Sequence, residues 1–152
     1  MKKDVRKIAE EVVEKIRHVC SRIRIAGSIR RGKQNPRDID IVLIPKDKEK
    51  LKAVMEKIGK YEQGGEHEST WNVNGINVEL YYTDENEWGA ELMAYSSKKG
   101  AGIGLRMIAK RKGLKLNQHG LFYRKTGKRI AGKTEEEIYK ALGRPYKSPR
   151  NR

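Results

Sequence analysis

The segment over residues 38–44 constrains the fold most, because it is typical of a strand whose two faces differ in chemistry. Alternate residues of a strand share a face, so Asp38 and Asp40 project from one side with Cα atoms roughly 7 Å apart. The apolar residues that alternate with them, up to Leu43, take the other side, which we expect to face the core. Two carboxylates on one face repel each other unless a divalent cation neutralises them, and Mg²⁺ prefers oxygen ligands together with substrate phosphates.

A glycine-bounded segment, Gly27-Ser28-Ile29-Arg30-Arg31-Gly32, precedes this strand. A strand-like stretch over residues 21–26 runs into it, and Ser28 is expected to cap a short helical turn. Backbone N–H groups at such a turn, a serine hydroxyl and two guanidinium groups suit the phosphates of a nucleotide. An isolated Asp-x-Asp pair is equally typical of a solvated strand edge. A strand this apolar that follows a phosphate-type loop favours a metal and nucleotide site.

A third acidic residue is expected from a hairpin. Asn74-Gly75 is a strong two-residue turn signal between strand-like residues 68–73 and 76–82. By the same alternation, Glu79 lies on the polar face of the second strand and is the only acidic residue in its interior. The alternative is a surface glutamate on a two-stranded ribbon. Because metal-assisted nucleotidyl transfer commonly uses three carboxylates, Glu79 is the candidate third ligand.

The remaining patterns predict a mixed α+β protein, in which a mixed sheet flanked by helices carries the acids. Helices are expected over residues 3–20, 47–58, 87–95, 105–112 and 134–142, and short strands around 114–116, 120–123 and 129–130. A glycine-rich segment at residues 100–104 separates two of the helices. We expect a catalytic domain over residues 1–96 and a small basic α/β subdomain over residues 97–152.

The net charge of +15 is concentrated toward one end of the chain. Residues 97–152 hold 17 Lys and Arg against 3 Asp and Glu, which leaves residues 1–96 close to neutral. A like-charged segment of this size favours a polyanionic partner, most often nucleic acid, over the alternative of a solubilising surface. Lys110, Arg111, Lys112 and Lys115 are spaced as a basic stripe that we expect to contact a DNA backbone.

Composition excludes several other classes of protein. With one cysteine, Cys20, the chain has no internal disulfide and no cysteine-based zinc cluster. No apolar run approaches the roughly 18 residues that a membrane span requires. The N-terminal residues lead into an amphipathic pattern and not into a signal peptide. We therefore expect a cytoplasmic protein that acts as a monomer and has no membrane partner.

These motifs resemble the signature of the DNA polymerase beta-like nucleotidyltransferases, and specifically of the family X DNA polymerases. The likeness begins with Gly27-Ser28-x-Arg30-Arg31-Gly32 and Asp38-x-Asp40 and continues in order along nearly the whole chain. Further matching segments are Val78-Glu79-Leu80, Trp88-Gly89-Ala90, Leu105-Arg106, residues 109–113, residues 114–122 and residues 129–136. The lyase and helix-hairpin-helix domains of larger members have no counterpart, so the resemblance implies a minimal palm and thumb.

The resemblance also implies roles for the matching positions. Asp38 and Asp40 would bridge two Mg²⁺ ions, for which Mn²⁺ can substitute, and Glu79 would bind the catalytic ion and help take the proton from the primer 3′-hydroxyl. The implied nucleotide contacts are Gly27, Ser28, Arg31, Gly32, Ala94, Tyr95, Ser97 and Gly102. The implied DNA contacts are Lys98, Lys99, Arg106, Lys110, Arg111 and His119. The expected reaction transfers a nucleotide from a dNTP to a primer on gapped or primer-template DNA, with release of pyrophosphate, in short-gap repair.

Three departures from the family pattern bear on this expected function. Glu79 stands where Asp is usual, and its longer side chain would shift the metal. The Tyr-Phe-Thr-Gly segment beneath the incoming sugar appears as Ala94-Tyr95-Ser96-Ser97, which resembles members that accept ribonucleotides, so we expect weak sugar discrimination and use of rNTPs. Gly102 and His119 replace an asparagine and a tyrosine, which predicts looser base selection.

Two other functions fit the same glycine-serine and acid pattern. One is a small nucleotidyltransferase that modifies a small molecule, a protein or an RNA end, and the other is a nucleic-acid-binding relative with impaired chemistry. The basic C-terminal third favours a polymerase over the first alternative, since small-molecule transferases need no polyanion track. The Asp38 and Asp40 pair with its phosphate-type loop argues against the second.

Overall fold

The structure is a computed structural model that describes residues 4–152, so Lys3, the first residue of the predicted N-terminal helix, lies outside the described residues. The chain divides into two compact units, one that ends at Thr83 and one that begins at Asp84. Within residues 4–152, no helix is both long enough and apolar enough to cross a membrane. The predicted mixed α+β class is confirmed.

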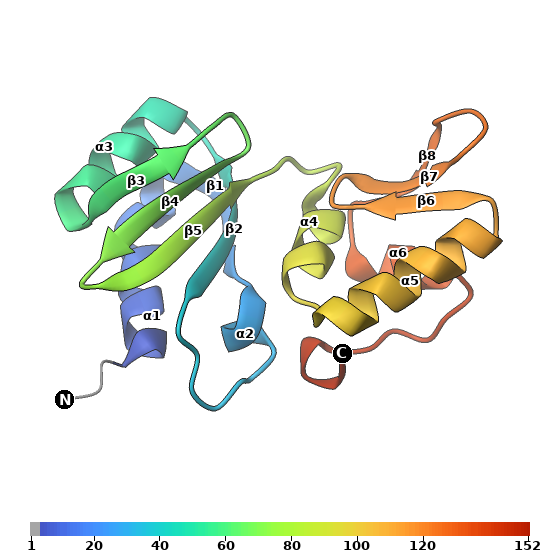
Figure 1. The fold of residues 1–152 in the computed structure, drawn as a ribbon. Coiled ribbons are helices and arrows are strands. Elements are labelled where there is room, and N and C mark those ends of the chain that lie inside the picture. The colour runs from blue at the N-terminus through green and yellow to red at the C-terminus, as the bar shows by residue number, and fades with distance from the viewer. Residues whose placement is uncertain (1–3) are drawn as a thin grey trace. The chain divides into compact units, whose positions relative to one another are not determined.

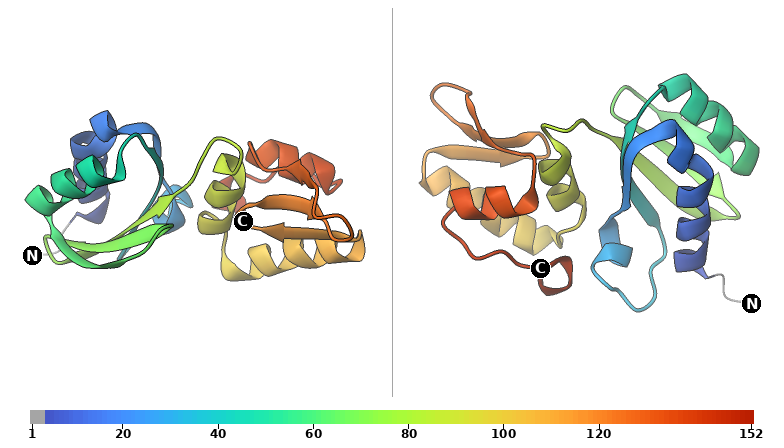
Figure 2. Two further views of the ribbon diagram at one scale, coloured as in Figure 1. Left: turned by 90° about the horizontal axis from the view of Figure 1, so that it is seen from above. Right: turned by 180° about the vertical axis from the view of Figure 1, so that it is seen from behind.

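The N-terminal unit is built on a five-stranded mixed sheet with the strand order β1-β2-β5-β4-β3 (Figures 1 and 2). Its strands are β1 (Cys20–Ile25), β2 (Ile39–Pro45), β3 (Lys60–Gly64), β4 (Glu68–Val73) and β5 (Ile76–Tyr82). Its helices are α1 (Val5–Ile16), a 3-10 turn η1 (Arg17–Val19), α2 (Gly27–Arg30) and α3 (Lys48–Ile58). β2 and β5 run parallel, whereas the other neighbouring pairs are antiparallel.

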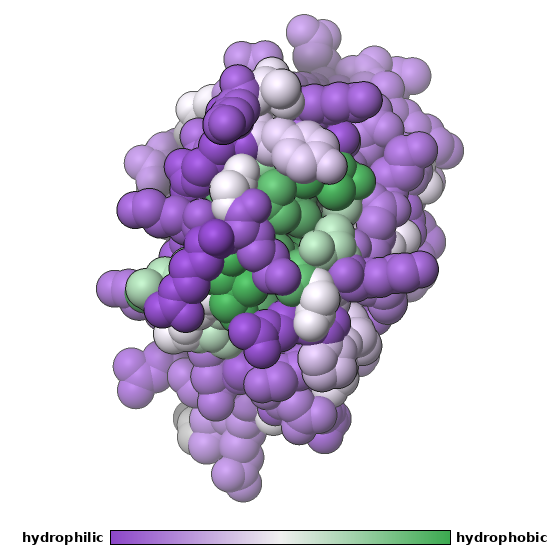
Figure 3. Space-filling view, turned by 90° about the vertical axis from the view of Figure 1, so that its right-hand side faces the viewer, coloured by the Kyte–Doolittle hydropathy of each residue, from purple (hydrophilic) through white to green (hydrophobic). Residues whose placement is uncertain are grey.

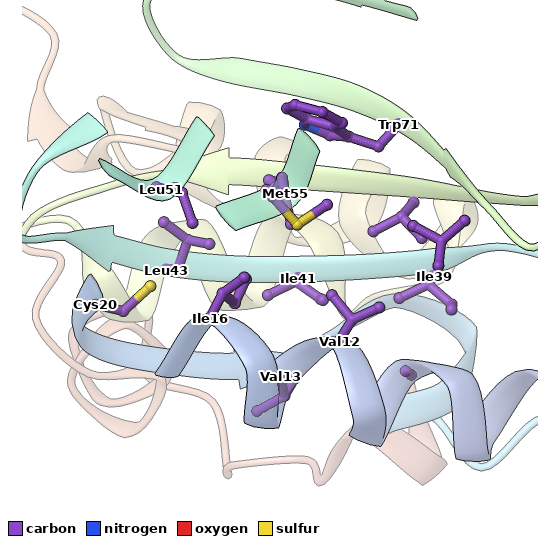
Figure 4. Close-up of a cluster of buried hydrophobic side chains, with 14 of the residues drawn as sticks. Val12, Val13, Ile16, Cys20, Ile39, Ile41, Leu43, Leu51, Met55 and Trp71 are labelled. Carbon is purple, nitrogen blue, oxygen red and sulfur yellow. The ribbon is translucent and has the colours of Figure 1, made fainter. Parts of the chain in front are cut away.

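Helices α1 and α3 cover one face of this sheet, and the core of the unit lies between them and the sheet (Figure 2). Figure 4 shows Ile41 and Leu43 of β2 in this layer, close to Ile16 of α1 and Met55 of α3. All four of these side chains are fully buried. Because alternate residues of a strand point to opposite faces, burial of this set turns Asp40 to the other face of the sheet.

Local signals begin and end the helices of this unit. The Asp4 side chain accepts a hydrogen bond from the Lys7 N–H at the start of α1, and the Asp47 side chain does the same for two N–H groups of α3. The hairpin between β4 and β5 has the predicted bounds, and Asn74 and Gly75 both have positive φ, as a tight hairpin turn requires.

The C-terminal unit combines a three-stranded antiparallel sheet of order β6-β7-β8 with three helices. Its elements are α4 (Trp88–Tyr95), α5 (Lys99–Arg111), β6 (Leu114–Asn117), β7 (Gly120–Tyr123), β8 (Arg129–Ala131), α6 (Glu135–Ala141) and a 3-10 turn η2 (Pro149–Asn151). Leu121, Ile138 and Leu142 are fully buried at the centre of its own core. The Thr134 hydroxyl caps α6, where it accepts from the Glu137 N–H, at the start of the helix predicted over residues 134–142.

The local predictions differ from the structure in several places. The helix predicted over residues 3–20 ends earlier, since α1 ends at Ile16 and β1 begins at Cys20. The glycine-rich segment at residues 100–104 is not a break but the first part of α5, which begins at Lys99 and not near Leu105. Ser28 lies inside α2, and the N-cap position is Ala26, which makes no side-chain hydrogen bond there. Strand β3 was not expected from the sequence, because all five of its residues are exposed and show no apolar alternation.

The first compact unit ends at Thr83 and the second begins at Asp84, which is earlier in the sequence than the boundary expected near residue 96. Helix α4 belongs with the C-terminal unit because the N–H groups of Gly89 and Ala90 donate to the carbonyls of Lys133 and Gly132. The boundary between catalytic and DNA-contacting regions at residues 96 and 97 stays a prediction about function.

Candidate active site

The parallel pairing of β2 and β5 sets two of the predicted acids side by side. Asp40 and Glu79 are direct register partners on these neighbouring strands, on the sheet face opposite to α1 and α3. The Tyr81 hydroxyl lies between them, 2.5 Å from Glu79 Oε2 and 3.3 Å from Asp40 Oδ1. The sheet therefore places next to each other two acids that are 39 positions apart in the sequence.

Asp38 lies directly before β2 and is exposed. Its negative charge acts on Asp40 from the same chain segment. Among the residues that the structure describes, these three acids do not form a set of donor atoms that all lie within 4.8 Å of one another, since the one set of that kind lies elsewhere. Asp40 and Glu79 thus share the Tyr81 hydroxyl, whereas Asp38 is exposed.

The electrostatics of Asp40 fit a cation site. Burial, followed by the negative charge of Glu79, raises the pKa of the Asp40 carboxyl to about 6, and Asp38 adds to the shift. The Tyr81 hydrogen bond and the Arg31 guanidinium act in the opposite direction, toward a lower pKa. A half-buried carboxylate with two other carboxylates near it is stabilised by a divalent cation, and oxygen donors of this kind are the ligands that Mg²⁺ prefers. The residues present therefore fit a divalent metal ion.

The predicted phosphate segment lies against this pair of acids. The Ala26 N–H donates to the Asp40 carbonyl at 2.7 Å, which ties the end of β1 to β2. Gly27 follows with φ of +63°, and the Asp40 side chain packs directly on its Cα. Ser28 and Arg31 are both half-buried on or next to α2, and Gly32 closes the turn with φ of +76°. All four predicted residues of this segment thus lie in one turn beside Asp40.

A second group of predicted residues gathers within the C-terminal unit, around a cavity of about 280 Å³. Its lining is Ala90, Met93, Ala94, Ser97, Gly102, Leu105, Arg106, Leu116, Asn117 and Gln118. The cavity brings together three predicted nucleotide-binding residues, Ala94, Ser97 and Gly102, with one predicted DNA-binding residue, Arg106. Tyr95 is half-buried and does not line it.

Helix α5 carries most of the predicted DNA-binding residues. Lys99, Arg106 and Lys110 recur at helical spacing on one face of the helix, and all are exposed. Lys98 precedes the helix and Arg111 ends it, and both are exposed as well. Residues 84–152 hold 17 basic against 7 acidic residues, so the basic surface belongs to this unit. Figure 3 shows a face of the molecule on which hydrophilic residues surround a hydrophobic area.

His119 lies in the turn between β6 and β7 and is held by its own unit. Its Nδ1 atom is 3.0 Å from Glu87 Oε1, and an Arg129 nitrogen is 3.8 Å from the same oxygen. Glu87 and His119 form, with Glu91, the set of donor atoms that all lie within 4.8 Å of one another. This set was not expected from the sequence, although Glu87, the N-cap residue of α4, and Glu91 are four positions apart and so lie on the same side of the helix.

Strand alternation predicts two further side chains on the face of Glu79, but it assigns them no role at the site. Asn77 and Tyr81 flank Glu79 on the polar face of β5, and both contact its carboxylate. The signal was present, since residues two positions away on a strand lie on the same face. Their hydrogen bonds could not be inferred from that alone.

The sequence of this chain resembles those of DNA polymerases along most of its length. The family profile of the DNA polymerase beta thumb matches residues 80–152. The chain is 28% identical over 147 residues to the repair DNA polymerase X of a South African tick isolate of African swine fever virus, with 90% of this chain and 84% of the relative covered. It is 27% identical, with the same coverage, to the protein of that name from a Kenyan pig isolate of the virus.

A mixed sheet with adjacent acids beside a glycine-serine turn, followed by a polymerase beta thumb, defines a nucleotidyltransferase of the DNA polymerase class. Within that class, the thumb match over residues 80–152 and the likeness to the viral repair polymerases support a family X DNA polymerase. Enzymes of this class depend on divalent metal ions.

Proposed function

We propose that this chain is a repair DNA polymerase that adds a nucleotide from a dNTP to the primer 3′-hydroxyl of gapped DNA and releases pyrophosphate. The observation that carries the proposal is the pairing of Asp40 with Glu79 on adjacent parallel strands, next to the Gly27–Gly32 turn. The thumb match and the name of the relatives, repair DNA polymerase X, support the substrate class.

In this proposal, Asp38, Asp40 and Glu79 hold two Mg²⁺ ions. When bound, such ions activate the attacking 3′-oxygen and stabilise the charge on the leaving pyrophosphate. Glu79 would also help to take the proton from the primer 3′-hydroxyl. Ser28 and Arg31 contact the triphosphate, because a serine hydroxyl and a guanidinium supply charge-assisted hydrogen bonds to phosphate oxygens.

The C-terminal unit would select the nucleotide and contact the DNA. We assign the cavity lined by Ala94, Ser97, Gly102 and Arg106 to the incoming nucleotide and the templating strand. The exposed basic side chains of α5 would contact backbone phosphates. A monomeric state and a cytoplasmic location stay predictions.

The test is primer extension on DNA with a one-nucleotide gap, in the presence of Mg²⁺ or Mn²⁺. We expect templated addition by the unmodified protein and none by the Asp38→Ala, Asp40→Ala double variant. Circular dichroism of the double variant should show an intact fold. If the unmodified protein transfers a nucleotide to a small molecule or an RNA end but not to the gapped primer, the alternative transferase function is correct.

We also propose weak discrimination between deoxyribose and ribose. Ala94 leaves space where the family usually has a tyrosine beneath the sugar. Comparable incorporation efficiencies for dNTPs and rNTPs are expected, and Ala94→Tyr should lower rNTP use while dNTP use changes less. A preference above about a thousandfold for dNTPs in the unmodified protein would refute this part of the proposal.

A further inference from the structure

We propose that Tyr81 is a positioning residue that holds the Glu79 carboxylate ready for metal binding. The inference rests on the proposed function only in taking Glu79 as a metal ligand. It goes further because it assigns a role to a side chain that the sequence motif does not include.

The Glu79 carboxylate is held at both of its oxygen atoms by neighbours on its own strand. Tyr81 donates its hydroxyl proton to Oε2 at 2.5 Å, and Asn77 Nδ2 lies 3.4 Å from Oε1. Because the three residues occupy alternate positions of β5, the strand itself sets their spacing. The Tyr81 side chain is buried, with 7% of the residue exposed, so its hydroxyl has a defined position.

A glutamate needs such support more than an aspartate does. Its side chain has one more rotatable bond, so its carboxylate samples a wider region unless hydrogen bonds restrict it. The Tyr81 hydrogen bond fixes one oxygen and leaves the remaining lone pairs of both oxygens open to a cation. The family's usual aspartate is shorter and would not reach the same contact.

Tyr81 also connects Glu79 to Asp40 across the two strands. Its hydroxyl oxygen lies 3.3 Å from Asp40 Oδ1, while Asp40 Oδ2 packs against Gly27. The hydroxyl therefore stands between the two carboxylates and sets their separation before a cation binds. A side chain that orients a metal ligand in this way changes metal affinity by about 10- to 100-fold when it is removed.

The test compares Tyr81→Phe, which keeps the buried ring and removes only the hydroxyl, with Glu79→Asp and the double variant. Mn²⁺ binding to the DNA-free protein is measured by electron paramagnetic resonance of the free ion. We expect Tyr81→Phe to bind Mn²⁺ about 10-fold more weakly. In the Glu79→Asp background, the same change should have less than about a twofold effect, because the shorter carboxylate no longer meets the hydroxyl.

Tyr82→Phe is the matched control. Tyr82 is the next residue of β5, but it points to the opposite face, where its hydroxyl lies 2.6 Å from Ser69 Oγ. Loss of this hydroxyl should leave Mn²⁺ affinity unchanged. A merely structural role of Tyr81 would instead lower the melting temperature without weakening Mn²⁺ binding.

Unchanged Mn²⁺ affinity in Tyr81→Phe, or an equal loss whether the change is made in the unmodified protein or in the Glu79→Asp variant, would overturn the proposal. Primer extension is measured in parallel on the same proteins. If the unmodified protein extends no primer but Tyr81→Phe still weakens Mn²⁺ binding through Glu79, the positioning role stands and the polymerase function fails. The two proposals are thus separable.

Discussion

The Asp40 carboxylate packs on the backbone of Gly27 so closely that a Cβ at residue 27 would stand 2.1 Å from Oδ2. The same glycine has φ of +63°, in the left-handed region that disfavours other residues. The position thus requires glycine for two reasons, one of which is the space that a candidate catalytic carboxylate occupies.

Gly27→Ala should therefore remove most of the primer-extension activity by displacing Asp40. Gly127→Ala is the control, because Gly127 has a similar φ of +72° but no atom within 4 Å of an added Cβ. Both variants carry the backbone strain, of roughly 1–2 kcal/mol, but only the first disturbs the acids. Equal activity in the two variants, measured by single-nucleotide addition, would contradict the displacement of Asp40.

Asp40→Asn should stabilise the metal-free protein at pH 7 to 8. The folded protein holds the Asp40 proton more tightly than the unfolded chain does, because its pKa is about 6 against an ordinary value of 3.8. Ionised Asp40 therefore costs stability above pH 6, by about 3 kcal/mol at most, and the cost disappears as the pH falls toward 4.

Thermal denaturation in EDTA between pH 4 and pH 8 measures this effect. The melting temperature of Asp40→Asn should exceed that of the unmodified protein at pH 8 and match it near pH 4. Added Mg²⁺ should raise the melting temperature of the unmodified protein more than that of the variant. A lower melting temperature of the variant than of the unmodified protein at pH 8 would show that ionised Asp40 does not destabilise the metal-free protein.

Glu135→Ala should destabilise the C-terminal unit by about 3–5 kcal/mol. Glu135 and Arg152 form an ion pair of 2.6 Å whose side chains are 5% and 1% exposed, and the guanidinium also lies near the rings of Tyr139 and Tyr146. Removal of one partner leaves a buried charge without its counter-ion. Replacing Glu135 and Arg152 together by apolar residues should lower the free energy of unfolding less than Glu135→Ala alone does.

Urea denaturation followed by tyrosine fluorescence measures these differences. The control is Glu14→Ala, which breaks an exposed pair with Arg17 at 2.9 Å and should change stability by less than about 1 kcal/mol. Similar losses of unfolding free energy in Glu135→Ala and Glu14→Ala would mean that the Glu135–Arg152 pair is not shielded from solvent.

The Lys110→Ala, Arg111→Ala double variant should bind gapped DNA with a shallower salt dependence. Each lost phosphate contact lowers the slope of log affinity against log salt by about 0.9, so a change of about 2 is expected. The control replaces Lys50 and Lys57, two exposed lysines of α3, with alanine. An equal change of slope in both variants, measured by fluorescence anisotropy, would show that general charge and not α5 binds the DNA.

Local rules were enough to predict part of this fold. The hairpin strands and the helix starts at Asp47 and Thr134 agree with the predictions, because turn type and helix capping depend on residues within a few positions. Strand β3 was missed because its pairing with β4, and not an apolar pattern of its own, makes it a strand. The start of α5 was placed too late because glycine has low helix propensity, which the tertiary structure overrides.

The candidate site was likewise predictable from the sequence only in part. Strand alternation in the sequence determined which face Asp40 and Glu79 occupy, because side-chain direction on a strand follows the backbone alone. Only the tertiary structure decided that β2 and β5 are parallel neighbours, that Asp40 therefore pairs with Glu79, and that the Tyr81 hydroxyl stands between them. Strand order and register depend on how the whole sheet packs against α1 and α3, and no local pattern encodes that packing.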